Sequence, residues 1–282
     1  MIRSLATRFP VRTLCRLLEV SASGYYQWRH PRPGPRAHAN QALLQHIRRA
    51  WEHSRQTYGS PRITRSLQRQ HLQCSENRVA RLMRRHRLQA KAKRPFRPRT
   101  TDSRLTSGPA PNRLKETGAP TRLNQVWVAD ITYIHTQNDW VYLAAVMDLH
   151  SRRILGWSVG GSLHSTLVKD ALQHALDLRR PAPGLIHHSD RGSQYASGIF
   201  QSLLRSAQLL PSMSGRGNCY DNAAMESFWS TLKTELIQGL SLRDLPHASQ
   251  VIHHYIERFY NPKRLHSALG FLSPLEFESK LS

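Results

Sequence analysis

The pattern of hydrophobic and polar residues changes along the chain near residue 124. Up to about residue 90, apolar side chains recur at helical spacing, as Leu14, Leu17 and Leu18 do. From residue 124 to about residue 240, short runs rich in strand-forming residues are interleaved with helical segments. We therefore expect an all-α region followed by an α/β domain.

Two segments of the N-terminal region have the outline of a helix-turn-helix, in which two short helices flank a turn. The first begins at residue 11 and is interrupted by Ser-Ala-Ser-Gly at 21–24, and the second runs from 58 to 90. In the second segment Pro61 suits the first turn of a helix, and Ser75 suits the N-cap of the next. We predict a helix-turn-helix region over residues 1–90.

The last helix of this region separates apolar from basic side chains. Its apolar stripe consists of Val79, Leu82 and Met83. Arg78, Arg81 and Arg85 share another face at i, i+3 and i+7. A helix of this kind packs through one face and presents the other to DNA phosphates or base edges. The alternative is a solvated helical surface.

The α/β region has a recognisable order of elements. We predict strands at 126–134, 140–150, 154–161, 184–190 and 210–214, and helices at 165–179, 198–208, 222–237 and 245–261. Short connections between the first three strands indicate an antiparallel meander. Three such strands followed by helix, strand, helix, strand, helix is the order of the ribonuclease-H-like α/β fold. We predict this fold, with a C-terminal helical tail, for residues 124–282.

Charge is distributed unevenly along the chain, which has a net charge of +23. Residues 1–120 hold 26 Lys and Arg against 5 Asp and Glu, whereas residues 121–282 hold 15 against 13. A strongly polarised basic chain favours a polyanionic partner, and nucleic acid is the commonest. Residues 91–123 contain five prolines, and we predict a basic linker that follows a DNA backbone.

Several other classes of protein lack support in the sequence. The longest apolar run, at 140–147, is far shorter than the ~20 residues of a membrane span, and no signal peptide is evident. Cys15, Cys74 and Cys219 form no CxxC pair, which fits a reducing cytoplasm. No HExxH, phosphate-binding GxxxxGK[ST] or dinucleotide-binding GxGxxG motif occurs.

Three acidic residues lie where the predicted elements would bring them together. Asp130 interrupts the apolar strand VWVADITYI, where an unpaired carboxylate would be costly or would take up a proton. Asp190 closes the fourth strand, and Glu226 lies 35 intervening residues later in a helix. In this fold the first and fourth strands are neighbours and the late helix packs across their ends. Carboxylates so placed favour two Mg²⁺ ions.

Each of these residues also has a structural alternative. Asp130 can pair with an arginine, Asp190 can serve only as a turn residue, and Glu226 can be an exposed helical charge. Lys233 lies two helical turns after Glu226, so it either holds a DNA phosphate near the metals or is merely solvated. Structural roles are predicted for four further residues: Asp148 at a turn, Asp221 as a helix cap, and His187 and His188 in a strand.

Several motifs resemble bacterial insertion-sequence transposases of the DDE type, in particular their catalytic second-reading-frame product, which is related to retroviral integrases. They are WVADITYI, HHSDRGSQY, YDNAAMESFWSTLKTE and YNPKRLHSALGFLSPLEFE, with VSASGYYQWR and YGSPRIT towards the N-terminus. The resemblance implies Asp130, Asp190 and Glu226 as a metal-binding catalytic triad with Mg²⁺ or Mn²⁺. It also implies cleavage of DNA at the ends of a mobile element, followed by strand transfer from the freed 3′-hydroxyl.

The resemblance leaves the accessory components open. No heptad run occurs in the sequence, so we expect a first-reading-frame helix-turn-helix and leucine-zipper protein to act as a partner or fusion. A homo-oligomer on DNA is also expected. Two alternatives to a transposase are a nuclease of the same fold and a non-enzymatic DNA-binding regulator that uses residues 1–90.

Overall fold

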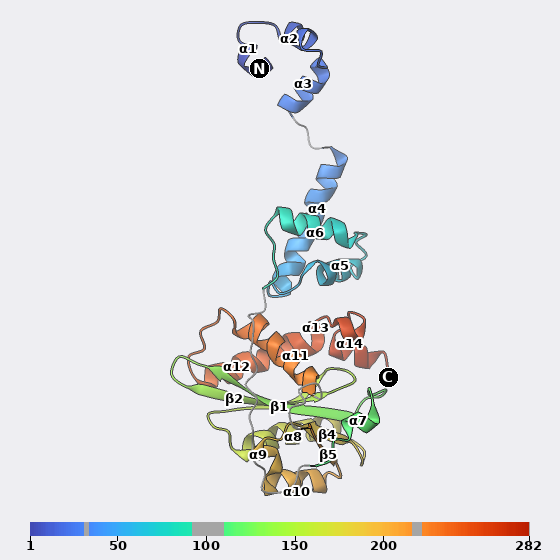
Figure 1. The fold of residues 1–282 in the computed structure, drawn as a ribbon, viewed down its shortest axis with the longest axis vertical. Coiled ribbons are helices and arrows are strands. Elements are labelled where there is room, and N and C mark those ends of the chain that lie inside the picture. Colours follow the sequence, from blue (N-terminus) through green and yellow to red (C-terminus); the bar gives the residue numbers. More distant parts are fainter. Residues whose placement is uncertain (31–33, 92–109, 216–221, 282) are drawn as a thin grey trace.

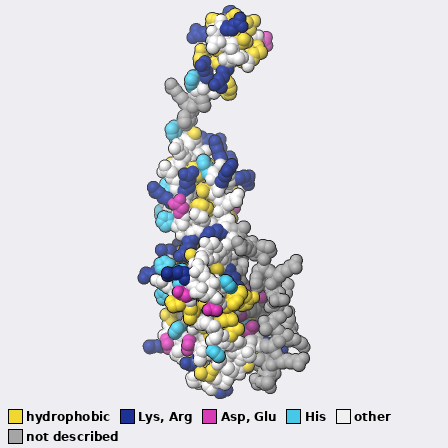
Figure 2. Space-filling view, turned by 90° about the vertical axis from the view of Figure 1, so that its left-hand side faces the viewer, with side chains coloured by type: hydrophobic (Ala, Val, Ile, Leu, Met, Phe, Trp, Pro, Cys, Tyr) yellow, Lys and Arg dark blue, Asp and Glu magenta, His cyan; other side chains and the backbone are white. Residues whose placement is uncertain are grey.

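The computed structural model describes residues 1–30, 34–91, 110–215 and 222–281, which form three parts in succession (Figure 1). The first part is a small group of helices: α1 Ile2–Leu5, α2 Val11–Leu17 and α3 Ala22–Arg29. The second is a three-helix unit of α4 Pro35–His53, α5 Ser60–Gln68 and α6 Glu76–Arg85. The third is an α/β domain. Figure 2 shows Lys and Arg side chains over the two helical parts on the face in view.

The apolar faces of the three helices pack together in a core that continues into the C-terminal layer of the α/β domain. Ile47, Ile63 and Val79, one from each helix, are fully buried. The side chain of Ser75 accepts a hydrogen bond from the backbone N–H of Arg78, which confirms the predicted N-cap. The long helix α4 was not predicted, although its apolar face completes this core.

The α/β domain is built on a five-stranded sheet in the order β3-β2-β1-β4-β5. Its strands are β1 Val126–His135, β2 Trp140–Asp148, β3 Ile154–Gly160, β4 Ile186–Ser189 and β5 Leu210–Met213. The first three pair antiparallel, whereas β4 pairs parallel with β1 and with β5. This confirms the meander, the predicted adjacency of the first and fourth strands, and the ribonuclease-H-like topology.

Helices cover both faces of the sheet, and the alternation of side chains along β1 serves both layers. Trp127 and Ala129 pack in one hydrophobic cluster with α8 Ser165–Arg179 and α10 Gly198–Ser206. Val126 and Val128 pack in the other cluster, with α11 Ala223–Leu232 and α12 Leu245–Tyr255. Helix α8 approaches β3 so closely that a Cβ at Gly156 would collide with the carbonyl oxygen of Ala171.

The C-terminal segment is helical and contains two π-helical turns. Helix α11 continues into η2 Lys233–Ile237, and α12 continues into η3 Ile256–Tyr260. The remaining elements are α7 Leu114–Thr117, α9 Ser193–Ala196, α13 Asn261–Lys263, η4 Ser267–Leu269 and α14 Pro274–Ser279. Helix α7 falls within the predicted linker, most of which lies outside the described residues. No helix in the described part of the chain is long and apolar enough to cross a membrane.

A buried ion pair joins the first π-helical turn to the segment after the second. The Nε and Nη2 atoms of Arg264 donate to the carboxylate of Glu235 at 2.8–3.0 Å, and both side chains are about 5–6% exposed. The hydroxyl of Tyr255 donates to the same carboxylate at 2.8 Å. Glu235 is therefore a structural residue directed into the C-terminal layer.

The three-helix unit contacts the α/β domain through this same C-terminal segment. The hydroxyl of Tyr58, which precedes α5, accepts a hydrogen bond of 2.7 Å from the backbone N–H of Leu265. Arg69 forms an ion pair with Glu276, whose side chain also completes the capping box of α14. These contacts join residues about 207 positions apart in the sequence.

Replacing Arg264 with Met should strongly destabilise the protein, because it leaves the Glu235 carboxylate buried without a cation. Removal of one partner of a buried pair costs about 3–5 kcal/mol. Urea unfolding followed by circular dichroism measures the loss. Arg69→Met is the matched control, since its pair with Glu276 is exposed and should contribute less than about 1 kcal/mol. Equal losses for the two variants would contradict the prediction.

Candidate active site

The first candidate carboxylate is fixed in the centre of the sheet. Asp130 lies in β1 opposite Ala145 of β2. Its Oδ1 atom accepts a hydrogen bond from the backbone N–H of Ile131 at 2.8 Å. Its Oδ2 atom accepts one from the indole Nε1 of Trp229 on α11 at 2.9 Å. The indole therefore orients the carboxylate and links the central strand to the late helix.

The second carboxylate is placed by the pairing of parallel strands. Residues 126–128 of β1 pair with 186–188 of β4, and Asp190 follows the last residue of β4 directly. Continuing this register by two residues sets Asp190 next to Asp130. The Oδ1 atom of Asp190 accepts a hydrogen bond of 2.9 Å from the backbone N–H of Gly192. Asp190 is thus the turn residue that the sequence suggested, and it also lies beside Asp130.

The third carboxylate is on the helix that crosses this edge of the sheet. Glu226 lies in the first turn of α11 and is exposed, one turn before Trp229. The adjacent N-cap residue, Asn222, is buried, and its Nδ2 donates to the backbone oxygen of Ala129 at 3.4 Å. Its Oδ1 atom has no hydrogen-bond partner among the described residues. A buried acceptor of this kind can bind a ligand or water close to Asp130.

The charges of two of the carboxylates act on the third, Asp130. The pKa of Asp130 is raised to about 7, first by burial and then by the negative charges of Asp190 and Glu226. Burial also raises the pKa of Asp190. Within the described part of the chain, no three His, Cys, Asp or Glu side chains are close enough to enclose one metal ion. The structure therefore brings the three charges into one region without joining them in a closed coordination shell.

Lys233 lies on the border of this region. Its Nζ atom is 5.0 Å from the ring centroid of Tyr133, near the end of β1. Burial lowers the pKa of the ammonium group, and the charge of Asp130 opposes this effect. Tyr133 and Trp140 are both about half exposed, and their rings meet edge to face at 5.4 Å. A cation and two exposed aromatic rings thus flank the acidic region.

Two of the residues predicted to be structural, Asp148 and His188, have partners of their own. The carboxylate of Asp148 accepts backbone N–H hydrogen bonds from His150 and Ser151 in the turn after β2, and a third from Asn124, which precedes β1. His188 lies between the hydroxyls of Ser212 and Ser214. These findings confirm both interpretations. Asp221 lies outside the described residues.

The three arginines of α6 differ in their surroundings. Arg81 and Arg85 are exposed, whereas Arg78 is half-buried and its Nε donates to Asn40 of α4 at 2.9 Å. Of the three, Arg81 and Arg85 therefore present their guanidinium groups most openly to a partner. Spacing within one helix could not show the contact with α4.

Comparisons with known proteins give the family. Residues 120–219 and 207–274 match models described as integrase core domain, and residues 38–96 match an HTH-like domain. The "Insertion element IS600 uncharacterized 31 kDa protein" of Shigella sonnei is 43% identical over 95% of this chain and 98% of its own length. "Transposase InsF for insertion sequence IS3A" of Escherichia coli is 40% identical over 96% and 95%. The chain belongs to the insertion-sequence transposases.

Two further similarities extend this comparison. The transposase for insertion sequence element IS904 of Lactococcus lactis is 39% identical over 88% of this transposase and 98% of its own length. The HTLV-2 integrase catalytic core domain, solved in complex with magnesium, is 17% identical over 55% of this chain and 95% of its own, with a TM-score of 0.44. The fold of this transposase follows from its strand order and from the integrase core match.

For two residues of the candidate site, the sequence of this transposase gave no indication of their contacts with β1. Trp229 lies in the apolar helix FWSTL, where an indole is an ordinary core residue, and only the packing of α11 on β1 shows its bond to Asp130. Asn222 lies four residues before Glu226, and this spacing alone indicates no contact with β1. Its contact with β1 again depends on the crossing of two distant elements.

Replacing Asp130 with Asn should stabilise the metal-free protein above neutral pH. The pKa of Asp130 is raised from 3.8 to about 7 in the folded state, so the folded state holds a proton that the unfolded state releases. The wild-type protein therefore loses stability as the pH rises from about 4 to 7, whereas the asparagine side chain cannot ionise. We expect a gain of roughly 1–3 kcal/mol at pH 8 that vanishes below pH 4.

Urea unfolding of both proteins across this pH range, with a chelator present, measures the difference. Asp170→Asn, at a half-exposed position on α8, is the matched control and should show no such pH-dependent gain. A constant difference between wild type and Asp130→Asn at all pH values would contradict the prediction.

Proposed function

We propose that this transposase cuts and joins DNA strands by phosphoryl transfer with divalent cations, and that Asp130, Asp190 and Glu226 hold the cations. The main observation is that three carboxylates from three separate elements lie in one region, where the charges of two of them act on the third. The pKa of Asp130 rises to about 7 because two further negative charges act on a buried carboxyl group. Such a group of charges is stable at neutral pH when a cation is bound.

The donors suit Mg²⁺ or Mn²⁺, since hard divalent cations prefer carboxylate oxygens and keep water or phosphate as further ligands. The Oδ1 of Asn222, which lacks a partner in the part of the chain that the structure describes, adds a neutral oxygen next to β1. Two such ions would activate the attacking oxygen and stabilise the leaving oxygen of an in-line displacement. Trp229 holds the Asp130 carboxylate in place through its N–H donor.

The surroundings of the carboxylates suit a DNA strand. Lys233 places a cation near Asp130, where it would bind a phosphate next to the reacting one. The exposed rings of Tyr133 and Trp140 offer a surface on which unpaired bases stack. A DNA end would therefore be held by charge on its backbone and by stacking on its bases.

The two helical parts would bind the DNA outside the reaction centre. Arg81 and Arg85 on α6 are exposed and face away from the buried stripe of that helix, as a groove-reading helix requires. Arg78 would serve mainly to fix α6 on α4. We further propose assembly of several copies on DNA, and a first-reading-frame helix-turn-helix protein as partner or fusion.

Asp190→Asn should abolish strand transfer and leave DNA binding largely intact. The substitution removes one ligand charge, and loss of a catalytic group of this kind costs on the order of 10³-fold or more in rate. The assay uses purified protein, Mg²⁺ and labelled DNA with a free 3′-hydroxyl, and the product is joined DNA. Asp170→Asn is the control for loss of one half-exposed carboxylate.

Each alternative function gives a different result in this assay. Shortened products without joined products would identify a nuclease, and binding without any product in the wild-type protein would favour a regulator. Normal joining by Asp190→Asn would show that the carboxylate assignment is wrong.

Replacing Arg81 and Arg85 together with Gln should weaken DNA binding and reduce its salt dependence. Removing one phosphate contact lowers the slope of log K against log salt concentration by about 0.9, so removing two changes it by nearly 2. Fluorescence anisotropy with a labelled duplex at several salt concentrations measures the slope. Lys169→Gln with Arg205→Gln, on α8 and α10, is the control for charge alone. An unchanged slope in the α6 variant would count against the predicted contact.

A further inference from the structure

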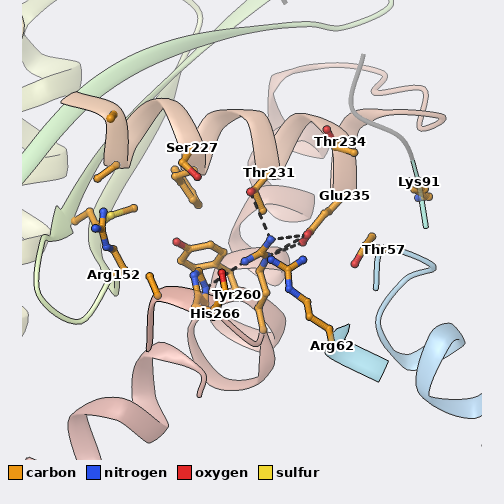
Figure 3. A pocket seen from close by; sticks show the side chains of 17 residues that line it. Thr57, Arg62, Lys91, Arg152, Ser227, Thr231, Thr234, Glu235, Tyr260 and His266 are labelled. Atoms are coloured by element: carbon orange, nitrogen blue, oxygen red, sulfur yellow. Dashed lines mark hydrogen bonds and ion pairs between the residues drawn. The ribbon is translucent and has the colours of Figure 1, made fainter. Parts of the chain in front are cut away.

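A second polar region lies on the other side of α11, between the three-helix unit and the α/β domain (Figure 3). It is a pocket of about 370 Å³. The segment after α4 and helix α5 contribute Thr57 and Arg62, and Lys91 follows α6. The remaining lining residues come from β2 and its turn, from α11 with η2, and from residues 260–268. The pocket is therefore formed only where the two parts meet.

The pocket contains more positive charge than its own carboxylate can balance. Its charged lining residues are Arg62, Lys91, Arg152, Arg264 and Glu235. Glu235 is fully engaged by Arg264 and Tyr255. Arg62 and Arg152 form no ion pair with a carboxylate anywhere in the described chain, and both are only partly exposed. Burial lowers the pKa of both guanidinium groups. Cations in this setting are stabilised by an anion from outside.

The two arginines occupy opposite ends of the pocket. Figure 3 shows Arg62 and Arg152 on either side of His266 and Tyr260. Both guanidinium charges act on His266, whereas neither contributes to the pKa shift of the other. The pKa of His266 falls to about 2 through burial and the positive charges of Arg264, Arg62 and Arg152, so its ring is neutral and adds no charge of its own. An extended anion with charge at both ends fits this arrangement better than a single compact ion.

Neutral donors lie between these two ends. Ser227 and Thr231 are one helical turn apart on α11 and both face the pocket in Figure 3. Hydroxyl groups at this spacing can donate to phosphate oxygens. The volume is near the lower limit for small-ligand pockets, which leaves room for a piece of one strand but not for a double helix.

We propose that this pocket binds a short segment of DNA backbone, with one phosphate at Arg62 and another at Arg152. The identity of the anion as DNA rests on the proposed function, whereas the phosphate chemistry rests on the pocket itself. Because Arg62 belongs to the three-helix unit and Arg152 to the turn between β2 and β3, the strand would hold the two parts together. The bound strand would lie on a different face of α11 from Glu226.

The test compares Arg62→Gln and Arg152→Gln with Arg205→Gln, an exposed control on α10. Fluorescence anisotropy with a labelled duplex that carries a single-stranded end is measured in chelator, so the outcome does not depend on the metal-binding carboxylates. Each pocket variant should bind about 5–10-fold more weakly and lower the salt slope by about 0.9, while the control matches wild type. Arg62→Lys keeps the charge and should recover most of the affinity.

Thermal unfolding shows whether weaker DNA binding by a variant results from poor folding. Without anions Arg62→Gln should unfold at the wild-type temperature or higher, because it removes repulsion between Arg62 and Arg264. The duplex should raise the unfolding temperature of wild type more than that of either pocket variant. Unchanged affinity and slope in both variants would overturn the proposal. If inorganic phosphate stabilises the wild type as much as the duplex does, and the variants bind DNA as the wild type does, the pocket is a site for free phosphate. That result would also overturn the proposal.

Discussion

The parallel hydrogen bonding of β1 to β4 is the constraint on which the acidic region depends. These strands are separated in sequence by β2, β3 and α8, yet their register sets Asp190 beside Asp130. Without that pairing, Asp190 would be only the first residue of a surface turn. Helix α11 then adds Glu226 from a third element and fixes Asp130 through Trp229. Burial of Asp130, and after it the nearby charges of Asp190 and Glu226, raise the pKa of this carboxyl group.

Helix α11 separates two regions of opposite charge. One side carries Glu226 near the sheet edge, and the other lines the basic pocket with Ser227 and Thr231. The buried pair of Glu235 with Arg264 fixes the end of this helix against the C-terminal segment. The acidic side suits cations and the basic side suits phosphates. One helix therefore borders both the region that suits cations and the pocket that suits phosphates, and a phosphoryl-transfer enzyme must position both.

Much of this arrangement could be read from the sequence because it depends on local patterns. Short runs rich in strand-forming residues indicated the strands, Ser75 marked the start of α6, and an acid inside an apolar strand marked Asp130. The same reasoning missed α4, the contact of Arg78 with Asn40, and the indole bond of Trp229. These depend on which helix packs on which element, and spacing along one segment does not contain that information.

The arginines of the pocket show the same limit more sharply. Arg62 and Arg152 are ordinary members of a basic chain that holds 41 Lys and Arg residues, and only the folded arrangement shows that neither forms an ion pair within the described chain.

The hydrogen bond between Tyr58 and Leu265 has a consequence for synthesis of the protein. A contact across about 207 residues cannot form until the later residue has left the ribosome. During most of translation the three-helix unit is present on the nascent chain while the segment that it contacts has not yet been made. The basic pocket therefore comes into being only after residue 268 has emerged, so a polypeptide whose translation stops earlier would carry the helical parts without a completed inter-domain site.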